Sequence, residues 1–163
     1  NDENISKEIN AIKNFGRTVK VGEVYNVMGL NFKFTDLQAS FGIPQMKKLP
    51  FIILHKKELF RWYKRHLKNK VEFINTDLQY VTPTYPEILV NKRDKLVEEL
   101  RAEQIGCRAV YDSLSNQPFH RQWKTSTPVA NELAKTGLHL PAQFDLKEQD
   151  VKKICDIIKN HAA

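Results

Sequence analysis

The residues with the clearest potential for chemistry are an asparagine and a lysine two positions apart, Asn31 and Lys33, which lie shortly before a predicted helix. An asparagine amide offers two hydrogen-bond donors, and a lysine ammonium offers three donors together with a positive charge. Near a helix start, where backbone N–H groups are also unpaired, such donors suit a phosphate or another oxyanion. A polar turn with both side chains in water is the alternative, and the residue types alone favour neither interpretation.

The segment GLNFKF (residues 29–34) alternates polar and apolar side chains. In an extended chain, alternate side chains point to opposite sides, so the polar residues should share one side with Thr35. The apolar side is expected to face a core and consists of Leu30, Phe32 and Phe34.

The helix that follows should begin directly after Thr35, because Thr35 and Gln38 have the spacing of a capping box. Proline cannot donate a backbone hydrogen bond, so Pro44, together with the nearby glycine, should bend or interrupt this helix. Pro50 suits the first turn of a second, longer helix that continues to about Asn69. An earlier amphipathic helix is expected over residues 4–14.

The net charge of +7 is concentrated in the second of these helices. Residues 55–70 contain seven Lys or Arg residues and one acid, Glu58. At helical spacing four cations form a stripe opposite an apolar stripe. The basic stripe has two possible interpretations. It is either a solvated helix face or a surface that attracts a polyanion or phosphate-bearing substrates. No DNA or RNA recognition motif is present, so nucleic acid is not an expected partner. The basic stripe consists of Lys57, Arg61, Lys64 and Lys68. The apolar stripe consists of Ile52, Leu59, Phe60, Tyr63 and Leu67.

From residue 71 onward, short β-branched and aromatic segments alternate with amphipathic helical patterns. The predicted order is strand, strand, helix, strand, helix, strand, helix, which is typical of a small α/β sandwich. We therefore expect a domain over residues 51–163, including the long basic helix. Residues 1–50 have apolar faces with too few partners to bury them, and they should belong to a different domain. Three helix starts are expected at the capping residues Asn91, Thr127 and Asp145.

No complete catalytic or metal-binding set is recognisable. The chain lacks a Gly-rich phosphate loop and a nucleophile elbow, and its five histidines have no metal-ligand spacing. Cys107 and Cys155 are expected to be buried free thiols. The loop around His120 and Arg121 either lines a substrate pocket or packs against its own side chains. No apolar run of about 18 residues is present, so neither a membrane span nor a membrane partner is expected, and the predicted location is cytoplasmic.

The segment GLNFKFTDLQASFGIPQMKKL resembles the G-x-N-x-R-x-(T/S)-(D/E)-x-Q-A-A-x-G-x-x-Q-L-x-x-L segment of the vitamin B6-dependent nucleotide-sugar aminotransferases, the DegT/DnrJ/EryC1/StrS family. Three further segments are similar to the family in the same order. The first, NDENISKEINAIKNFGR, resembles the stretch just after the family's catalytic lysine. NKRDKLVEELRAEQIGCRAVYDSLSNQPFH and LHLPAQFDLKEQDVKKICDII resemble two later motifs.

The resemblance implies the fold-type-I aminotransferase fold, with the end of the large domain in residues 1–50 and the small C-terminal domain after it. It implies that Asn31 crosses a dimer interface to bind the phosphate of pyridoxal 5'-phosphate in the neighbouring subunit. Lys33 occupies a position that is usually Arg, so the charge is kept but the bidentate guanidinium is lost. Tyr111 and Ser115 match the substrate side of the Y-x-P-L-H motif, in which Ser115 replaces a histidine.

The family's catalytic lysine, and the aspartate that pairs with the cofactor's pyridine nitrogen, precede the first residue of this sequence in the family pattern. The cofactor's chemistry depends on both groups. We therefore expect no catalytic residue in this chain, a cofactor bound mainly by a missing N-terminal part, and inactivity of the chain alone. The expected parent enzyme moves an amino group, with glutamate as the expected donor, to a nucleotide-linked keto-sugar. The alternative is a stand-alone, non-catalytic binding or regulatory module derived from that family.

Overall fold

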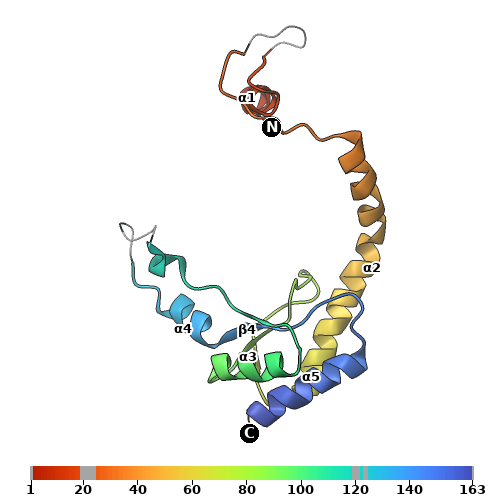
Figure 1. Cartoon of the computed structure of the whole chain (residues 1–163), viewed down its shortest axis with the longest axis vertical. Helices are drawn as coiled ribbons and strands as arrows, with labels where there is room; N and C mark the ends of the chain where they lie inside the picture. Colours follow the sequence, from red (N-terminus) through yellow and green to blue (C-terminus); the bar gives the residue numbers. More distant parts are fainter. Residues whose placement is uncertain (1, 19–24, 119–121, 123–124, 163) are drawn as a thin grey trace. The chain divides into compact units, whose positions relative to one another are not determined.

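The computed structural model describes residues 2–18, 25–118, 122 and 125–162, and its backbone traces are shown in Figure 1. The chain folds as two compact units, Asn1–Lys48 and Leu49–Ala163. Whether these units are the ends of a large and a small aminotransferase domain stays a prediction at this point. No helix among the described residues is long and apolar enough to cross a membrane.

Helix α1 (Glu3–Lys13) is the first element of the N-terminal unit. Asp2 Oδ1 caps it by accepting hydrogen bonds from the backbone N–H groups of Asn4 (2.9 Å) and Ile5 (3.2 Å). The helix confirms the predicted amphipathic segment. Its isoleucines nevertheless remain about half exposed, and Ala11 is the one fully buried residue of the helix. The apolar face of α1 therefore lacks a partner within this unit, as the sequence predicted.

Helix α2 (Asp36–His66) begins with the predicted capping box. The backbone N–H of Thr35 donates to Gln38 Oε1 at 2.8 Å, and the backbone N–H of Gln38 donates to Thr35 Oγ1 at 3.2 Å. The predicted interruption at Pro44 and the new helix start at Pro50 are both wrong, because α2 is continuous through these positions. Each proline removes one backbone donor, and the good helix formers between them keep the remaining hydrogen bonds in place.

The C-terminal end of α2 also lies earlier than predicted. The helix ends at His66 rather than near Asn69. Leu67 still donates its N–H to Tyr63 O at 2.9 Å, but Asn69 adopts a left-handed conformation with a φ of 61°. Asparagine tolerates this conformation better than most residues, and it turns the chain out of the helix.

The C-terminal unit contains a four-stranded antiparallel sheet with the order β1-β2-β4-β3. Its strands are short and alternate with helices in the predicted order (Figure 1). The strands are β1 (Glu72–Phe73), β2 (Glu87–Leu89), β3 (Arg108–Ala109) and β4 (Gly137–His139), and the remaining helices are η1 (Leu114–Asn116), α3 (Arg93–Ala102), α4 (Pro128–Thr136) and α5 (Glu148–His161).

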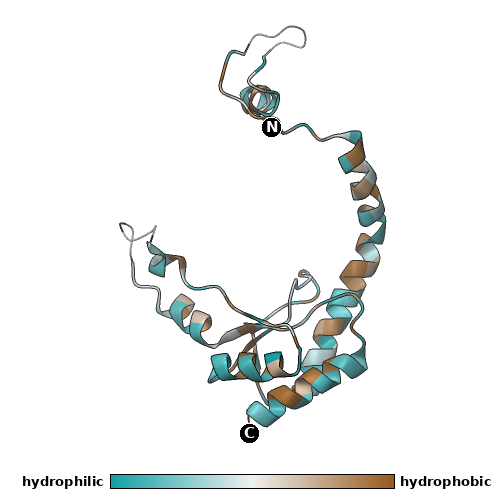
Figure 2. Cartoon of the chain, in the orientation of Figure 1, coloured by the Kyte–Doolittle hydropathy of each residue, from teal (hydrophilic) through white to brown (hydrophobic). Residues whose placement is uncertain are grey.

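The register of the sheet separates its two faces. Ile88 of β2 stands opposite Leu138 of β4, and both side chains are fully buried. This face packs against the last turns of α2 and against α3 and α5, whose apolar residues form the core. Figure 2 shows the apolar stretches of these elements in brown. The core residues of the helices are Leu59, Tyr63, Leu67, Leu96, Leu100, Val151, Ile154, Cys155 and Ile158.

Three predicted helix caps differ from the structure. Helix α3 starts after Lys92, so Lys92 and not Asn91 occupies the N-cap position. The backbone of Lys92 is left-handed, with a φ of 54°. Helix α5 is capped at Lys147, whose N–H donates to Asp150 Oδ2 at 3.0 Å, rather than at Asp145. Thr127 does precede α4, but its side chain does not cap the helix. Its hydroxyl is instead hydrogen-bonded to two serines.

Candidate functional site

Asn31 is held in place by backbone hydrogen bonds between the end of α1 and the segment that follows it. Leu30 donates its N–H to Ile12 O at 2.7 Å, and Phe32 donates to Lys13 O at 3.0 Å. Asn14 and Asn31 therefore form an isolated antiparallel bridge. This pairing fixes the backbone of Asn31 even though the segment is not part of a sheet.

Two glycines allow this close pairing. Gly16 has a φ of 85°, a conformation that side chains disfavour, and its O accepts the N–H of Asn26 at 2.9 Å. A Cβ on Gly16 would collide with the carbonyl group of Val27, and one on Gly29 would collide with the backbone of Gly16. Gly16 and Gly29 thus allow the segment that carries Asn31 to pair closely with the end of α1.

The side chains of Asn31 and Lys33 are both exposed, as the alternating pattern predicted. Lys33 Nζ lies 5.2 Å from the centroid of the Phe15 ring, a cation–π contact that keeps the ammonium near the end of α1. The structure therefore brings these two predicted site residues together in the N-terminal unit, beside the start of α2.

The predicted burial of the apolar residues on the opposite side is wrong. Leu30 is 56% exposed, Phe32 67% and Phe34 73%. The described part of this unit offers no apolar surface to cover them, since Ala11 is its one buried hydrophobic residue. The polar and the apolar residues of this segment are therefore all exposed, and the predicted core face is not formed among the described residues of this unit.

Tyr111, the predicted substrate-side residue of the C-terminal unit, is 63% exposed. Its ring packs edge-on against the imidazole of His139, with 5.8 Å between centroids. The guanidinium carbon of Arg108 lies 4.5 Å from the centroid of the Tyr111 ring. Tyr111 is thus fixed between two cationic or polar side chains while most of its surface faces solvent.

These contacts belong to a larger group of side chains that the sequence analysis missed. Glu87 and Arg108 are the register partners of His139 on its two sides, so the three side chains form one row across the sheet. Tyr85, two residues before Glu87, places its ring 5.3 Å from the imidazole. We call this group the tyrosine–histidine surface, and its members are Tyr85, Glu87, Arg108, Tyr111 and His139.

The sequence carried one signal for this surface. Glu87 and His139 each interrupt a short apolar strand, YPEILV and LHLP, with a polar residue. A polar residue in such a strand indicates the face turned away from the core. The pairing of the two could not be read from the sequence, because the register of strands about 50 residues apart is set by tertiary packing.

Lys56 of α2 fixes the backbone on both sides of this surface. Its ammonium donates to Thr84 O at 2.9 Å and to Ala142 O at 2.7 Å. The same nitrogen lies 5.8 Å from the centroid of the Tyr85 ring. Burial lowers the pKa of Lys56 below its ordinary value. Lys56 thus connects α2 to the segments before β2 and after β4.

Ser115, the fourth predicted site residue, does not join Tyr111. Its hydroxyl lies 2.6 Å from Thr127 Oγ1 and 2.8 Å from Ser113 Oγ, and the latter two oxygens are 3.0 Å apart. Three hydroxyls can satisfy one another in such a ring because each both donates and accepts. This ring explains why the Thr127 side chain does not cap α4.

The basic stripe of α2 is mainly a solvated surface in this structure. Arg61 pairs with Glu58 at 3.0 Å on the same helix, and Lys64 and Lys68 are exposed. Arg65 is an exception, since its guanidinium lies 2.6 Å from Glu148 Oε1 and links α2 to α5. His120 and Arg121 lie outside the described residues. Within the described ranges, no group of His, Cys, Asp or Glu side chains could hold a metal ion.

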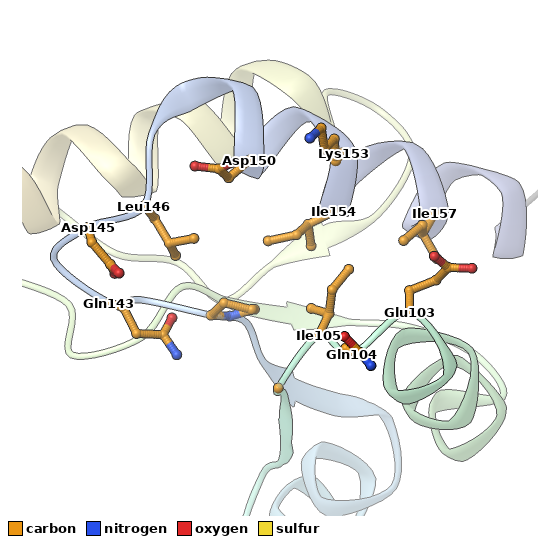
Figure 3. Close-up of a pocket in the computed structure, with 12 residues that line it drawn as sticks. Glu103, Gln104, Ile105, Gln143, Asp145, Leu146, Asp150, Lys153, Ile154 and Ile157 are labelled. Carbon is orange, nitrogen blue, oxygen red and sulfur yellow. The ribbon is translucent and has the colours of Figure 1, made fainter.

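A pocket of ≈ 520 Å³ lies between α5 and the chain segments before β3 and after β4. Figure 3 shows Ile105, Leu146 and Ile154 pointing into this pocket, with Asp145 and Asp150 at one side. None of the predicted site residues lines it. The pocket has an apolar floor and three carboxylates, Glu103, Asp145 and Asp150, and its lining contains no Ser, Thr, Cys, Tyr or His side chain, so we assign no chemistry to it.

The sequence profile of the DegT/DnrJ/EryC1/StrS aminotransferase family matches residues 1–159. This chain belongs to that family. The match covers nearly the whole sequence, including the Asn31 segment and the tyrosine–histidine surface, and it confirms the resemblance that the motifs indicated.

Relatives of known activity are sugar aminotransferases. The dTDP-4-amino-4,6-dideoxy-D-glucose transaminase of Escherichia coli is 30% identical over 166 residues, which are 92% of this chain and 43% of that protein. A GDP-perosamine synthase of Escherichia coli O157:H7 is 24% identical over 139 residues, which are 82% and 38% of the two chains. The chain therefore spans about two fifths of the length of these relatives.

Solved structures confirm the fold. A DegT/DnrJ/EryC1/StrS aminotransferase from Brucella abortus superimposes with a TM-score of 0.85 at 22% identity, covering 99% of this chain and 44% of that chain. PseC of Helicobacter pylori, an aminotransferase of pseudoaminic acid biosynthesis, gives a TM-score of 0.81 at 19% identity, with coverages of 98% and 46%. The predicted fold class is correct: the chain has the α/β fold of part of a PLP-dependent sugar aminotransferase.

Proposed function

We propose that this chain is the C-terminal part of an aminotransferase that acts on a nucleotide-linked keto-sugar, with glutamate as the amino donor. Pyridoxal 5'-phosphate would supply the electron sink for amino transfer, and it would be bound mainly by an N-terminal part that carries the catalytic lysine. The observation that carries the proposal is the exposed Asn31 segment, held by backbone pairing within a chain that belongs to this family. The cytoplasm is the proposed location.

The donors at Asn31 and Lys33 suit a phosphate group. An Asn amide offers two N–H donors, and a Lys ammonium adds charge. Both side chains are exposed, and the backbone that carries Asn31 is fixed at both neighbours. In the proposed assembly Asn31 binds the cofactor phosphate held by a second subunit, and Lys33 adds positive charge on the substrate side.

Exposed apolar residues support an assembly of this kind. Phe32 and Phe34, close to Asn31, are more than 60% exposed, and the first half of α2 also exposes large apolar residues. Such a concentration of exposed apolar area is typical of surfaces that bind another protein segment. We propose that a second subunit, or the missing N-terminal part, covers it.

Tyr111 is the proposed substrate contact of the C-terminal unit. It combines an exposed aromatic face with a hydroxyl, and its ring is held by His139 and Arg108. Ser115 was predicted to have the same role. Its hydroxyl is part of the ring with Ser113 and Thr127, so its contact with substrate would require the hydroxyl to share its lone pairs.

The test is made on the native assembly, isolated from its source through an affinity tag on this chain. We expect it to contain a second polypeptide or segment with the catalytic lysine, bound pyridoxal 5'-phosphate, and glutamate-dependent amination of UDP-, GDP- or dTDP-linked 4-keto-sugars. Asn31→Ala should lower cofactor content, and Asn4→Ala, at an exposed position on α1, should not.

Two results would contradict the proposal. The first is a chain that purifies under native conditions without a second polypeptide and without bound pyridoxal 5'-phosphate. That result would favour the stand-alone module. The second is bound cofactor that borohydride reduction attaches to a lysine of this chain, because that would place the catalytic lysine here.

A further inference from the structure

His139 is a buried polar residue to which the proposed function assigns no role. It is 7% exposed. Nδ1 lies 3.0 Å from Glu87 Oε1, and Nε2 has no hydrogen-bonding partner among the described residues. Burying a polar atom without a partner is unfavourable, so the position of Nε2 calls for a reason beyond packing.

The imidazole lies beneath two exposed tyrosines. Tyr85 is 47% exposed and Tyr111 63%, and each ring contacts His139. Both rings therefore pack on the same buried side chain. Because the ring nitrogens of His139 are covered, a ligand on this surface would contact the tyrosines and not the imidazole.

The charges of the tyrosine–histidine surface are balanced, although the chain as a whole carries +7. Glu87, with its side chain 34% exposed, can only accept hydrogen bonds when ionised, and the exposed Arg108 can only donate them. A bare phosphate would be repelled by Glu87. A neutral ring with several hydroxyls fits better, because hydroxyls donate to Glu87 and accept from Arg108.

The aromatic faces favour the same class of ligand. A sugar ring presents C–H groups on its faces and hydroxyls at its edges, and exposed tyrosines offer a flat apolar surface with a polar tip. A pocket of ≈ 500 Å³ adjoins Arg108 and Tyr111, so the surface has space beside it for the rest of a larger ligand.

We propose that the tyrosine–histidine surface binds the sugar ring of the nucleotide-linked substrate, with His139 as the residue that positions both tyrosines. Tyr85 and Tyr111 contact the C–H groups of the ring, and Glu87 and Arg108 bind its hydroxyls. This inference rests on the proposed function, since the sugar is part of the proposed substrate, and it assigns the sugar to named residues of this chain.

Saturation-transfer NMR on the full chain tests the assignment, because it detects weak binding and reports which ligand protons approach the protein. The probes are UDP-N-acetylglucosamine, GDP-mannose and dTDP-glucose, each compared with its nucleoside diphosphate. We expect the sugar-ring protons of at least one probe to receive more saturation than its base protons. Glu87→Gln and Tyr111→Leu should each weaken that binding about tenfold, the effect of losing one hydrogen bond to a charged group or one contact of similar size.

Two controls separate binding from folding. Tyr80→Leu removes a more exposed tyrosine from the turn before β2 and should leave the saturation of the sugar protons unchanged. The imidazole resonances of His139 should shift on addition of the probe, whereas those of His66, which lies against Glu148 at 3.1 Å, should not. A purely structural His139 would not show this ligand-dependent signature.

Either of two outcomes overturns the inference, and they differ in what they say about the proposed function. If a sugar nucleotide binds but the Glu87 and Tyr111 variants bind it unchanged, the sugar lies elsewhere and the proposed function stands. If no probe binds the chain and the native assembly also fails to aminate nucleotide-linked keto-sugars, both proposals fail.

Discussion

Gly16 and Gly29 lie with their main chains in direct contact, so that a Cβ on Gly29 would overlap the backbone nitrogen of Gly16. This contact brings the segment that carries Asn31 against the end of α1, where Leu30 and Phe32 donate to Ile12 O and Lys13 O. The position of a proposed ligand-binding side chain therefore depends on two residues that have no side chain.

Alanine at Gly16 should displace this segment. The substitution places a Cβ against Val27 and forces a φ of 85° on a residue with a side chain, at a cost of about 1–3 kcal/mol. Hydrogen exchange of the Leu30 and Phe32 amides should accelerate accordingly. Gly42→Ala is the matched control: a Cβ there meets nothing within 4 Å, and in a helix alanine should stabilise by about 0.5–1 kcal/mol. Equal exchange rates in the two variants would mean that the glycine contact does not hold the segment.

Asn31→Ala should weaken cofactor binding in the assembled enzyme. If the amide donates to a charged phosphate oxygen, its loss costs about 1–3 kcal/mol, roughly a 5- to 150-fold decrease in affinity. Lys33→Arg should preserve the affinity for the nucleotide-linked substrate, because the guanidinium keeps the charge, and Lys33→Met should weaken that affinity. Equilibrium dialysis of the cofactor and of the substrate gives the two comparisons. An Asn31→Ala enzyme that retains wild-type affinity would remove Asn31 from the phosphate site.

Features set by local sequence could be predicted well. The capping box at Thr35 and Gln38 and the order of strands and helices both follow from spacing within a few residues. These features depend on the spacing of residue types, which can be read directly from the sequence.

Features that depend on contacts between residues far apart in the sequence could not be predicted. The continuity of α2 through Pro44 was not predicted, because a helix can lose single backbone hydrogen bonds at a proline and keep the others. The row of Glu87, His139 and Arg108 depends on the register between three strands that are far apart in the sequence. The hydroxyl ring redirected Thr127 from the capping role that its neighbour Pro128 suggested.

Lys56→Met should destabilise the C-terminal unit. The substitution keeps most of the apolar stem but removes the two hydrogen bonds to Thr84 O and Ala142 O, which should cost about 1–3 kcal/mol. Urea denaturation followed by circular dichroism measures the loss. Lys68→Met, at an exposed position just after α2, should change the free energy of unfolding by less than about 0.5 kcal/mol. Similar effects of the two substitutions would show that the hydrogen bonds of the part-buried Lys56 ammonium do not stabilise the unit.

The buried thiol of Cys155 should make the fold sensitive to alkali. Burial, with a smaller contribution from the charge of Asp156 and against the opposing effect of Lys159, raises the pKa of Cys155 from 9.0 to about 12. Its stabilising contribution is complete below pH 9, where the thiol is neutral in both states. Between pH 9 and 12 the thiol ionises in the unfolded chain alone, so stability falls by on the order of 1 kcal/mol per pH unit.

Cys155→Ala should therefore lose less stability than the wild type between about pH 8 and about pH 11 in parallel urea titrations. Cys107→Ala is the comparison, because that thiol is half-buried and burial raises its pKa against the opposing charge of Arg101. Burial also raises the pKa of Tyr63, so some alkaline loss should remain in both variants. Identical alkaline slopes for wild type and Cys155→Ala would contradict this account.

Ser115→Ala separates the structural role of this hydroxyl from the predicted substrate contact. The variant leaves Ser113 and Thr127 able to bond each other at 3.0 Å, so the loss of stability should be about 0.5–1.5 kcal/mol, the value of one hydrogen bond. Ser113→Ala removes a more deeply buried member of the same ring and should cost at least as much. If the ring is the main role of Ser115, both variants should keep wild-type KM for the nucleotide-linked sugar in the native assembly. A KM that rises for Ser115→Ala alone would instead place its hydroxyl on the substrate.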